Sequence, residues 1–469
     1  MDAPRVPRRP AHAVLLVALV LASGCLGAQA PPQAAPDLPV AATLAYAYAC
    51  PPGPTIGLPN GLCVRTIEAW PDAFEEPTLA VHPHDPDVLA IGTNTALAAT
   101  SLAEDPALAG RVDVFVSDDG GATWRRTTPP PRLNAGSQPA AREGAADPTL
   151  LFDDTGRLHV AQMTVRAGFE RSFDVQVFHS DDLGRTWHGS TLLATDGDND
   201  RPWLALGPGG AILLSWQNTW RDWAGSHVAW SLDGGKTWEG PLGTPGNCIS
   251  ISRALVVEGA ATFACSLWDG DAAQGRRFLR LDLEEGAWAE VVDEPGLGNG
   301  WSFWDRLPDG RVALATARGS HNRVAVSASG IEGWRTSEPL HALCACRGAE
   351  RPLVVTWLAA DPWGGIHILL GDGDPGFPTQ PRVDNARYLA GALELWHIVL
   401  DPDTMSVVLE QQLTLPVGDA REQRVPPPLG ATVGVDHVHG LVFSDAGGLV
   451  LWTRDRSLDM TRIVASPGS

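Results

Sequence analysis

The chain has 469 residues, with 34 Lys and Arg against 55 Asp and Glu, which gives a formal net charge of −21. So acidic a chain lacks the basic surface that binding to nucleic-acid phosphates requires, and we expect no nucleic-acid partner. Hydrophobic residues make up 44% and charged residues 19%, so the chain can bury a large core and is not intrinsically disordered. The 50 Gly and 39 Pro residues show no collagen period and are typical of many short strands joined by turns.

Residues 1–30 resemble an export signal, because a basic start is followed by a short apolar stretch at 13–22. Two processing sites remain open. The sequence ASGC, ending at Cys25, resembles a lipobox whose cysteine receives a lipid, whereas AQA at 28–30 suits an ordinary signal peptidase. The small residues before Cys25 and the Pro/Ala-rich tether at 31–40 favour a lipoprotein on the outer face of the cell membrane. The lipid would be its only membrane contact, and a secreted protein is the alternative.

Six further cysteines form an even set, which in an exported chain indicates disulfides. They are Cys50, Cys63, Cys248, Cys265, Cys344 and Cys346. Proximity in the sequence favours the pairs Cys50–Cys63 and Cys248–Cys265. Cys344 and Cys346 would then pair across one Ala, or form a CxC metal or redox site.

An eight-residue pattern, S-x-D-x-G-x-T-W, occurs three times without a gap. The copies are SDDGGATW at 117–124, SDDLGRTW at 180–187 and SLDGGKTW at 231–238. Degenerate copies end at Trp288 and Trp334. The five copies start at 117, 180, 231, 281 and 327, which are steps of 63, 51, 50 and 46 residues. A period near fifty is typical of a propeller blade of four strands.

The pattern has the chemistry of a turn between two strands. The alternating run at 112–116 predicts a strand before the first copy. The Asp can accept backbone N–H groups of the turn, the Gly permits a positive φ, and the Trp offers a large ring to pack between blades. We therefore interpret the residues of the three copies as structural. They are Ser117, Asp119, Gly121 and Trp124, then Ser180, Asp182, Gly184 and Trp187, then Ser231, Asp233, Gly235 and Trp238.

This pattern resembles the Asp box, or bacterial neuraminidase repeat, of the sialidase-like β-propellers. The resemblance covers most of the chain from about Glu75 onward. It implies that the boxes lie at blade hairpins. Because sialidases, other glycoside hydrolases and non-catalytic propellers share such boxes, the resemblance identifies the fold far better than the activity.

A second motif, a strand, a Gly- or Pro-bearing turn and a strand, opens each blade. Its copies begin near 76, 147, 201, 252, 301, 351 and 436. The sequence therefore predicts an all-β propeller of six to seven four-stranded antiparallel blades. The count favours seven, although the sialidases that the chain resembles have six. We expect one propeller domain at 41–469, in which the N-terminal run at 40–49 closes the last blade and removes its exposed edge.

Charged residues stand where the innermost strands begin, so they are expected to converge at one mouth of the central channel. They are Glu76, Asp147, Asp200, Glu350 and Asp436. Such a ring can bind Ca²⁺ or hydroxyl-rich ligands through its oxygens. The alternative is that each residue caps a strand or bonds the backbone of a neighbouring blade. Asp196, Asp198 and Asp200 are also spaced as at the start of a Ca²⁺ loop, but the Glu that completes an EF-hand is missing.

The resemblance also implies what sialidase chemistry would need: three Arg on the substrate carboxylate, a Tyr nucleophile with a Glu base, and an Asp acid. The candidates in this chain are Tyr388, Arg253 and Arg351. The FRIP-type motif that carries the first family Arg is absent, since CVRTIEAW around Arg65 does not match it. The set is incomplete, and we expect no strong sialidase activity.

Two functions follow from the sequence. The first is an exported, sialidase-like propeller that binds glycans, with exo-α-sialidase-like hydrolysis as its candidate activity. The second is a non-catalytic Asp-box propeller that binds a protein at the cell surface. In both cases we expect a monomer that binds its glycan or protein ligand at the channel mouth, with Ca²⁺ as the only candidate cofactor.

Overall fold

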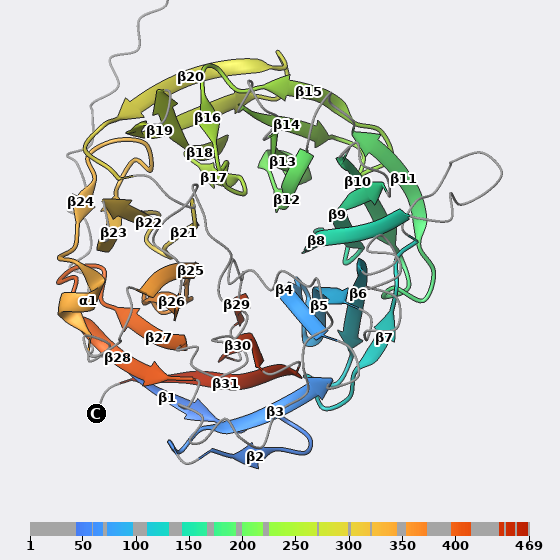
Figure 1. Cartoon of the computed structure of the whole chain (residues 1–469), viewed down its shortest axis with the longest axis vertical. Coiled ribbons are helices and arrows are strands. Elements are labelled where there is room, and N and C mark those ends of the chain that lie inside the picture. The colour runs from blue at the N-terminus through green and yellow to red at the C-terminus, as the bar shows by residue number, and fades with distance from the viewer. Residues whose placement is uncertain are drawn as a thin grey trace, which may run out of the picture. The chain divides into compact units, whose positions relative to one another are not determined.

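The computed structural model describes residues 44–58, 60–68, 73–96, 110–130, 143–166, 173–193, 199–218, 225–269, 272–298, 302–318, 321–344, 353–372, 395–413, 440–444, 447–454 and 457–467. These residues form seven antiparallel sheets, which are arranged as the blades of a ring (Figure 1). The protein is a seven-bladed β-propeller. The predicted fold class is confirmed, and the count of seven from the hairpin motif is correct.

Blades I to III each contain four strands, which follow one another in the chain from the axis outward. Blade I consists of β4 (Ala73–His82), β5 (Asp85–Ala96), β6 (Gly110–Ser117) and β7 (Arg125–Thr127). Blade II consists of β8 (Glu143–Phe152), β9 (Leu158–Arg166), β10 (Phe173–Ser180) and β11 (His188–Leu193). Blade III consists of β12 (Asn199–Leu206), β13 (Ile212–Asn218), β14 (Gly225–Ser231) and β15 (Glu239–Gly243), with a short 3₁₀ turn at Pro208–Gly210.

Blades IV to VI follow the same order. Blade IV consists of β16 (Cys248–Ile249) and β17 (Leu255–Val257), which both pair with β18 (Ala260–Asp269), then β19 (Ala272–Asp282) and β20 (Ala287–Glu294). Blade V consists of β21 (Trp304–Arg306), β22 (Val312–Arg318), β23 (His321–Ser327) and β24 (Arg335–Thr336), followed by the short helix α1 (Leu340–Leu343). Blade VI consists of β25 (Leu353–Ala360), β26 (Ile366–Asp372), β27 (Leu395–Leu400) and β28 (Val407–Gln412).

Blade VII joins the two ends of the described chain. Its inner strands are β29 (Gly440–Ser444), β30 (Gly447–Arg454) and β31 (Ser457–Pro467). Its outer side comes from the N-terminal part, namely β1 (Leu44–Ala49), β2 (Ile56–Gly57) and β3 (Cys63–Glu68). Both β1 and β3 pair with β31, at 462–467 and 458–460 respectively. The ring is thus closed by hydrogen bonds between strands that lie at opposite ends of the sequence (Figure 1).

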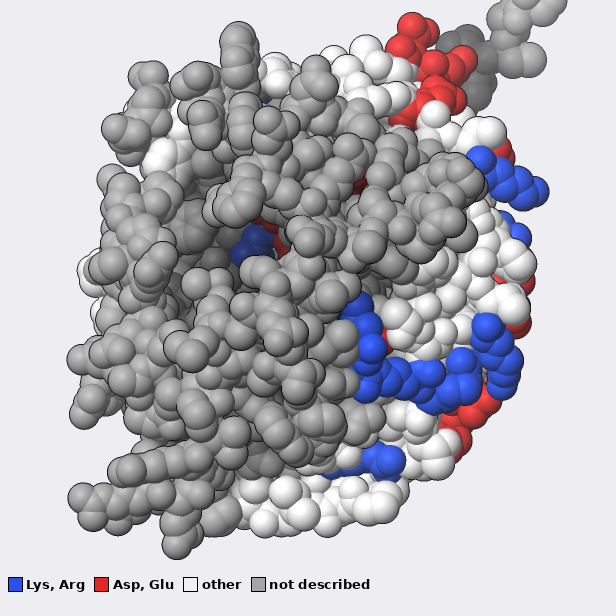
Figure 2. Space-filling view, turned by 45° about the vertical axis from the view of Figure 1, so that its right-hand side comes forward, with Lys and Arg blue, Asp and Glu red and all other residues white. Residues whose placement is uncertain are grey.

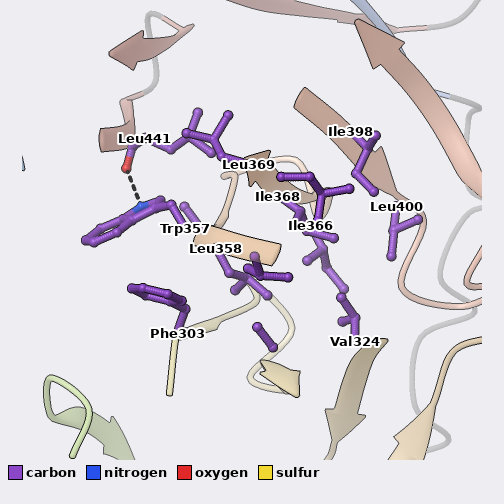
Figure 3. Packing of buried hydrophobic residues seen from close by; sticks show 14 of the residues in the cluster. Phe303, Val324, Trp357, Leu358, Ile366, Ile368, Leu369, Ile398, Leu400 and Leu441 are labelled. Carbon is purple, nitrogen blue, oxygen red and sulfur yellow. Dashed lines mark hydrogen bonds between the residues drawn. The ribbon is translucent and has the colours of Figure 1, made fainter. Parts of the chain in front are cut away.

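The position of a strand in its blade determines its pattern of burial. Every residue of β13 is buried, because an inner strand packs against neighbouring blades on both faces. The outermost strand β20 instead alternates between exposed and half-buried residues. The largest hydrophobic cluster extends over blades V, VI and VII, and Figure 3 shows Leu358, Ile366, Ile368 and Ile398 packed together within it. None of the helices in the described part of the chain is long and apolar enough to cross a membrane.

Two of the predicted disulfides are present. Cys50 is bonded to Cys63 with a Cα–Cα distance of 4.9 Å, and Cys248 to Cys265 with a distance of 5.6 Å. Cys344 is also engaged in a disulfide, and Cys346 lies outside the described residues. Disulfides persist in oxidising compartments, so these bonds indicate that the protein matures in one.

The three Asp boxes have the same geometry. In the second box the hydroxyl of Ser180 donates to Oδ1 of Asp182 (2.8 Å) and accepts the N–H of Gly184 (2.7 Å). The carboxylate of Asp182 accepts both the N–H (2.7 Å) and the hydroxyl (2.6 Å) of Thr186. The first and third boxes repeat these four bonds. The serine is buried and the carboxylates lie at the surface, so the interior acceptor of the turn is the serine hydroxyl.

The tryptophan that ends a box packs on the preceding blade. Nε1 of Trp187 donates to the hydroxyl of Thr127 in blade I (3.1 Å), and Nε1 of Trp288 donates to the carbonyl of Gly243 in blade III (2.9 Å). Trp334 stacks on Phe278 of blade IV, with ring centroids 5.1 Å apart. The boxes therefore fix the turn within one blade and the packing between two, as their composition predicted.

Candidate functional site

Three neighbouring inner strands begin with an irregular backbone. Asp147 in β8, Arg201 in β12 and Ser250 before β17 have φ angles of 52°, 50° and 53°, a region that residues other than Gly seldom adopt. The ladders of the innermost strands in blades I, II and III also shift register near this end. Such bulges re-aim side chains and are frequent beside functional sites. The side chains at this end of the inner strands are therefore the candidates for a functional site.

Asp147 is fixed by Asn94 of the neighbouring blade I. The backbone N–H of Asp147 donates to Oδ1 of Asn94 (2.6 Å), and Nδ2 of Asn94 donates back to Oδ1 of Asp147 (3.3 Å). One amide thus holds both the strained backbone and the carboxyl group of Asp147.

Asp200 lies on the other side of Asp147, in blade III. Nε2 of Gln217 donates to Oδ2 of Asp200 (2.9 Å), and the carboxyl groups of Asp200 and Asp147 are hydrogen-bonded to each other. Burial, followed by the negative charge of Asp147, raises the pKa of Asp200 to about 7, against the opposing charge of Arg201. Two carboxyl groups in contact cannot both ionise readily, so the pair retains one shared proton below about pH 7. We call Asn94, Asp147, Asp200, Arg201 and Gln217 the axial site.

The axial site offers donors and acceptors together. The two amide groups can donate, whereas the carboxyl and amide oxygens can accept; the proton shared by Asp147 and Asp200 is engaged between them. Arg201 adds a positive charge, so the site is mixed in sign. A buried carboxyl group whose pKa is strongly perturbed by a specific charged neighbour marks a candidate functional site.

Aromatic side chains from several blades meet at the axis. The ring centroid of Trp203 lies 6.3 Å from that of Phe303 and 6.0 Å from that of Trp357, and Phe303 lies 5.6 Å from Trp357. Nε1 of Trp357 donates to the carbonyl of Leu441 in blade VII (3.3 Å; Figure 3). Because Trp203 and Trp357 belong to blades III and VI, their contact crosses the ring. Trp203 belongs to β12, the strand that also carries Asp200, so the aromatic cluster lies close to the axial site.

Arg253, predicted to grip a substrate carboxylate, has a carboxylate partner within the protein. Its Nη2 lies 3.1 Å from Oδ1 of Asp305 and donates to the carbonyl of Trp304 (3.3 Å). The guanidinium also lies over the ring of Trp357, 5.9 Å from its centroid. The side chain is 31% exposed, so one part of it still faces solvent.

The structure brings together two of the predicted channel-mouth residues, Asp147 and Asp200. Glu76 belongs to β4, but its side chain is outside the described part of the structure. The remaining predicted residues lie outside the described residues altogether: Tyr388, Arg351, Glu350, Asp436, Asp196 and Asp198. Within the described ranges, no group of three or more His, Cys, Asp or Glu is arranged to hold a metal ion. Ca²⁺ binding stays a prediction.

Asn94 and Gln217 were not predicted from the sequence. Both lie on the second strand of a blade, and Gln217 is the direct ladder partner of Asp200. The register of the opening hairpin in blade III would have found Gln217, because a polar residue opposite an inner-strand carboxylate is its nearest donor. Asn94 lies opposite Glu75 in blade I and reaches Asp147 from a neighbouring blade, which no hairpin register records.

A family model for the BNR/Asp-box repeat matches residues 115–126, which include the first box. Comparison with curated proteins gave no match. A seven-bladed ring with Asp boxes at its hairpins defines a β-propeller of the Asp-box class. The chain is a seven-bladed β-propeller that carries Asp boxes.

Solved structures similar to the chain are propellers of low sequence identity. A protein of unknown function from Dyadobacter fermentans is 13% identical with a TM-score of 0.46, over 87% of this chain and 100% of that one. An α-L-arabinofuranosidase from Fusarium graminearum is 12% identical with a TM-score of 0.43, over 68% and 92%. A sialidase from Trypanosoma rangeli is 12% identical with a TM-score of 0.40, over 88% and 58%. The chain thus spans little more than half the length of this sialidase.

Proposed function

We propose that the protein is an exported, monomeric lipoprotein that binds an uncharged, hydroxyl-rich glycan at the axial site. The observation that carries the proposal is the proton-sharing pair of Asp147 and Asp200, held in place by Asn94 and Gln217. Sugar hydroxyl groups donate and accept at the same time, and the carboxyl oxygens of this pair together with the amides beside them present both functions within one small area.

The same pair argues against hydrolysis by two carboxylates. Glycosidases of that kind separate their carboxyl groups by about 5–5.5 Å or about 6.5–9.5 Å, so that each can play its own role. Carboxyl groups joined by a hydrogen bond are only about 2.5–3.0 Å apart and titrate as one unit. The geometry therefore favours binding without turnover.

A glycan array tests the ligand class. We expect wild-type protein to bind uncharged glycans, and we expect Asp147→Asn and Asp200→Asn to weaken that binding at least tenfold by removing the shared proton and its charge. Asp181→Asn is the matched control, since it removes a surface carboxylate that pairs with Arg157. Binding that survives both axial variants would disprove the proposed site.

Sialidase activity is tested separately with a fluorogenic sialoside. We expect no robust turnover, because losing one of three bidentate Arg contacts costs on the order of 10²-fold or more in rate. Turnover that is lost in Tyr388→Phe would make the enzyme hypothesis correct and the binding proposal wrong.

The anchor is tested by fractionation of cells that express the full chain. We expect Cys25→Ser to move the protein from the membrane fraction to the soluble fraction, because that cysteine would hold all of the acyl chains. The Cys248–Cys265 disulfide supports passage through an oxidising compartment, and it should form in both versions. Unchanged membrane association of Cys25→Ser would leave an ordinary signal peptide.

A protein ligand at the cell surface is the second candidate. A row of basic side chains crosses the outer side of the ring (Figure 2), although the chain as a whole is acidic. Arg125 and Arg185 of neighbouring blades lie close enough for the charge of Arg185 to lower the pKa of Arg125, after the larger effect of burial. Binding of an acidic protein there should not change in Asp147→Asn or Asp200→Asn, whereas binding of a ligand at the axial site should weaken in both variants.

A further inference from the structure

Three histidines form a row across strands β9, β10 and β11 of blade II. His179 stands directly opposite His159 in one ladder and opposite His188 in the other, so the three side chains share one face of the blade. The ring centroids of His159 and His179 are 6.1 Å apart, and those of His179 and His188 are 5.9 Å apart. The row leads from the interior to the surface, because His159 is fully buried, His179 is half-buried and His188 is exposed.

The carboxylate of Asp153 fixes the proton of His159. Nε2 of His159 lies 2.9 Å from Oδ2 of Asp153. Burial opposes ionisation of this carboxyl group, but the hydrogen bonds from His159, Thr155 and the N–H of Arg157 hold the pKa of Asp153 well below its usual value. An ionised carboxylate only accepts, so neutral His159 carries its proton on Nε2 and presents a lone pair at Nδ1.

This lone pair of His159 is buried without a donor. Among the described residues, Nδ1 of His159 has no hydrogen-bond partner. The adjoining residue of blade III is Gly235, at which a Cβ atom would lie 3.3 Å from Nδ1, so no side chain from that position reaches the lone pair. Because buried polar atoms are normally paired, Nδ1 of His159 is the feature of the row that calls for a ligand.

Blade VI contains the same arrangement with its histidine satisfied. Nε2 of His367 lies 2.7 Å from Oδ2 of Asp361, and Nδ1 of His367 lies 3.0 Å from Nε2 of His397. The two imidazoles of blade VI have centroids 5.1 Å apart, whereas those of His159 and His179 are 6.1 Å apart. The pair in blade VI is therefore joined by a direct hydrogen bond, and the wider pair in blade II is not.

The wider spacing suits a metal ion between the two rings. An imidazole nitrogen lies about 2.0–2.1 Å from a bound Zn²⁺, so two imidazoles on one ion have ring centroids about 5–6.5 Å apart, depending on the angle at the metal. Metal-binding histidines usually donate their other ring N–H to a carboxylate, which fixes the tautomer and makes the binding nitrogen more basic. Asp153 occupies that position behind His159.

The surroundings of the row favour a cation. The carboxylates of Asp153 and Asp181 lie there with one guanidinium, that of Arg157, whose Nε is 2.7 Å from Oδ1 of Asp181. Burial, followed by the charges of Arg157 and His159, lowers the pKa of His179 against the effect of Asp181. The imidazole of His179 is therefore neutral at neutral pH, which is the form that binds a metal.

We propose that His159 and His179 bind one divalent transition-metal ion that prefers imidazole, Cu²⁺ or Zn²⁺, through Nδ1 of His159 and a ring nitrogen of His179. Asp153 holds His159 in the binding tautomer. Water completes the coordination from the side of the exposed His188. The site is independent of the axial site, which is built on the ends of the inner strands β8 and β12 and their neighbours.

Titration of the full chain with Cu²⁺ alone and with Zn²⁺ alone at pH 7.5 tests the site. We expect one high-affinity ion per chain, with Cu²⁺ bound more tightly than Zn²⁺, and an electron paramagnetic resonance spectrum of the Cu²⁺ form that shows coupling to imidazole nitrogen. His179→Gln should weaken the binding of both ions at least tenfold. His159→Gln should do the same, because the amide keeps a donor for Asp153 and removes Nδ1.

His321→Gln is the matched control. His321 and His341 are both exposed and form another neighbouring pair, with centroids 4.8 Å apart. We expect this variant to bind the first ion as tightly as the wild-type protein does. Thermal unfolding shows whether each variant is folded, and Zn²⁺ should raise the melting temperature of the wild-type protein but not that of His179→Gln.

Three results would overturn the metal site. They are the absence of high-affinity binding in the wild-type protein, unchanged binding in folded His179→Gln, and loss of the first ion in His321→Gln. If His159→Gln does not fold, the half-buried His179 decides the question by itself.

Discussion

Asp200 shows how the environment decides the charge of a residue. As a free side chain it would be ionised at neutral pH, but burial and the neighbouring Asp147 raise its pKa to about 7. The unfolded chain therefore binds fewer protons at this residue than the folded chain between the ordinary pKa of 3.8 and about 7. Stability conferred by the protonated form is lost as pH rises through that window.

We predict that Asp200→Asn stabilises the protein at pH 8 and does so less at pH 5. One pKa unit corresponds to about 1.4 kcal/mol, so a rise of about three units allows a gain of up to about 4 kcal/mol at pH 8. At pH 5 the wild-type carboxyl is mostly protonated, so the increase in the free energy of unfolding should be smaller than at pH 8 by roughly 2–3 kcal/mol. Urea unfolding at the two pH values measures it, and a gain independent of pH would contradict the shared proton.

The Asp box shows which atom of a turn is buried. The motif draws attention to the aspartate, yet the serine hydroxyl is the interior group and the carboxylate is at the surface. The carboxylates still bond two groups of the threonine, and these bonds lower the pKa of Asp119, Asp182 and Asp233. This contribution is present above about pH 4 and lost as pH falls below it.

We predict that Ser180→Ala costs about 1–3 kcal/mol, because the buried N–H of Gly184 loses its acceptor. Ser406→Ala is the control, since that serine is exposed and its hydroxyl bonds the exposed hydroxyl of Thr404. Thermal unfolding measures both variants, and an equal loss in the two would contradict the role of the buried serine.

We also predict that Asp119→Ala, Asp182→Ala and Asp233→Ala each lower the melting temperature, because each removes three hydrogen bonds of its box. The axial site is remote from these hairpins, so ligand binding should persist. A box variant that lost binding at unchanged stability would refute the structural role for that blade.

A second local device recurs in the opening hairpins of two blades. Oδ1 of Asp153 accepts the N–H groups of Thr155 (2.9 Å) and Arg157 (3.0 Å), and Oδ2 lies 2.9 Å from Nε2 of the buried His159. Asp361 and His367 repeat the arrangement six residues apart in blade VI. The spacing D-x₅-H is visible in the sequence. The Asp and the His come into contact only because the hairpin turn between them brings the second strand back beside the first.

At the scale of the whole molecule, blade VII closes the ring. The outer side of blade VII comes from residues at the start of the described chain, and its inner strands come from the end. Thr66 donates to the buried Asp459 across this joint (2.6 Å), and Thr461 donates to the carbonyl of Cys63 (2.8 Å). The Cys50–Cys63 disulfide fixes the two outer strands to each other.

We predict that the double variant Cys50→Ser/Cys63→Ser loses about 3 kcal/mol, as expected for a loop of 13 residues. Limited proteolysis should then cut first within 44–68. The variant Cys248→Ser/Cys265→Ser, which opens a loop of 17 residues inside blade IV, should lose similar stability without that early cleavage. Identical cleavage patterns in the two double variants would show that the Cys50–Cys63 disulfide does not protect residues 44–68 from proteolysis.

The sequence by itself determined the features that act over short distances. The Asp boxes, the opening hairpins and two disulfides each involve residues within about twenty positions, so spacing and residue type were enough to predict the class of fold and the seven blades. Asp147 and Asp200 were also recognised as inner-strand carboxylates. Their shared proton was not, because it depends on how closely two blades approach.

Only the tertiary structure decided which distant residues meet. Tyr48 lies beside His397, 349 positions away, and Trp203 beside Trp357, because closing seven sheets into a ring brings the two ends together and points the inner strands at one axis. The alternation of hydrophobic and polar residues along one strand predicts neither the tilt of its blade nor the residues that it contacts across the ring. Those contacts are set by the packing of all seven sheets at once.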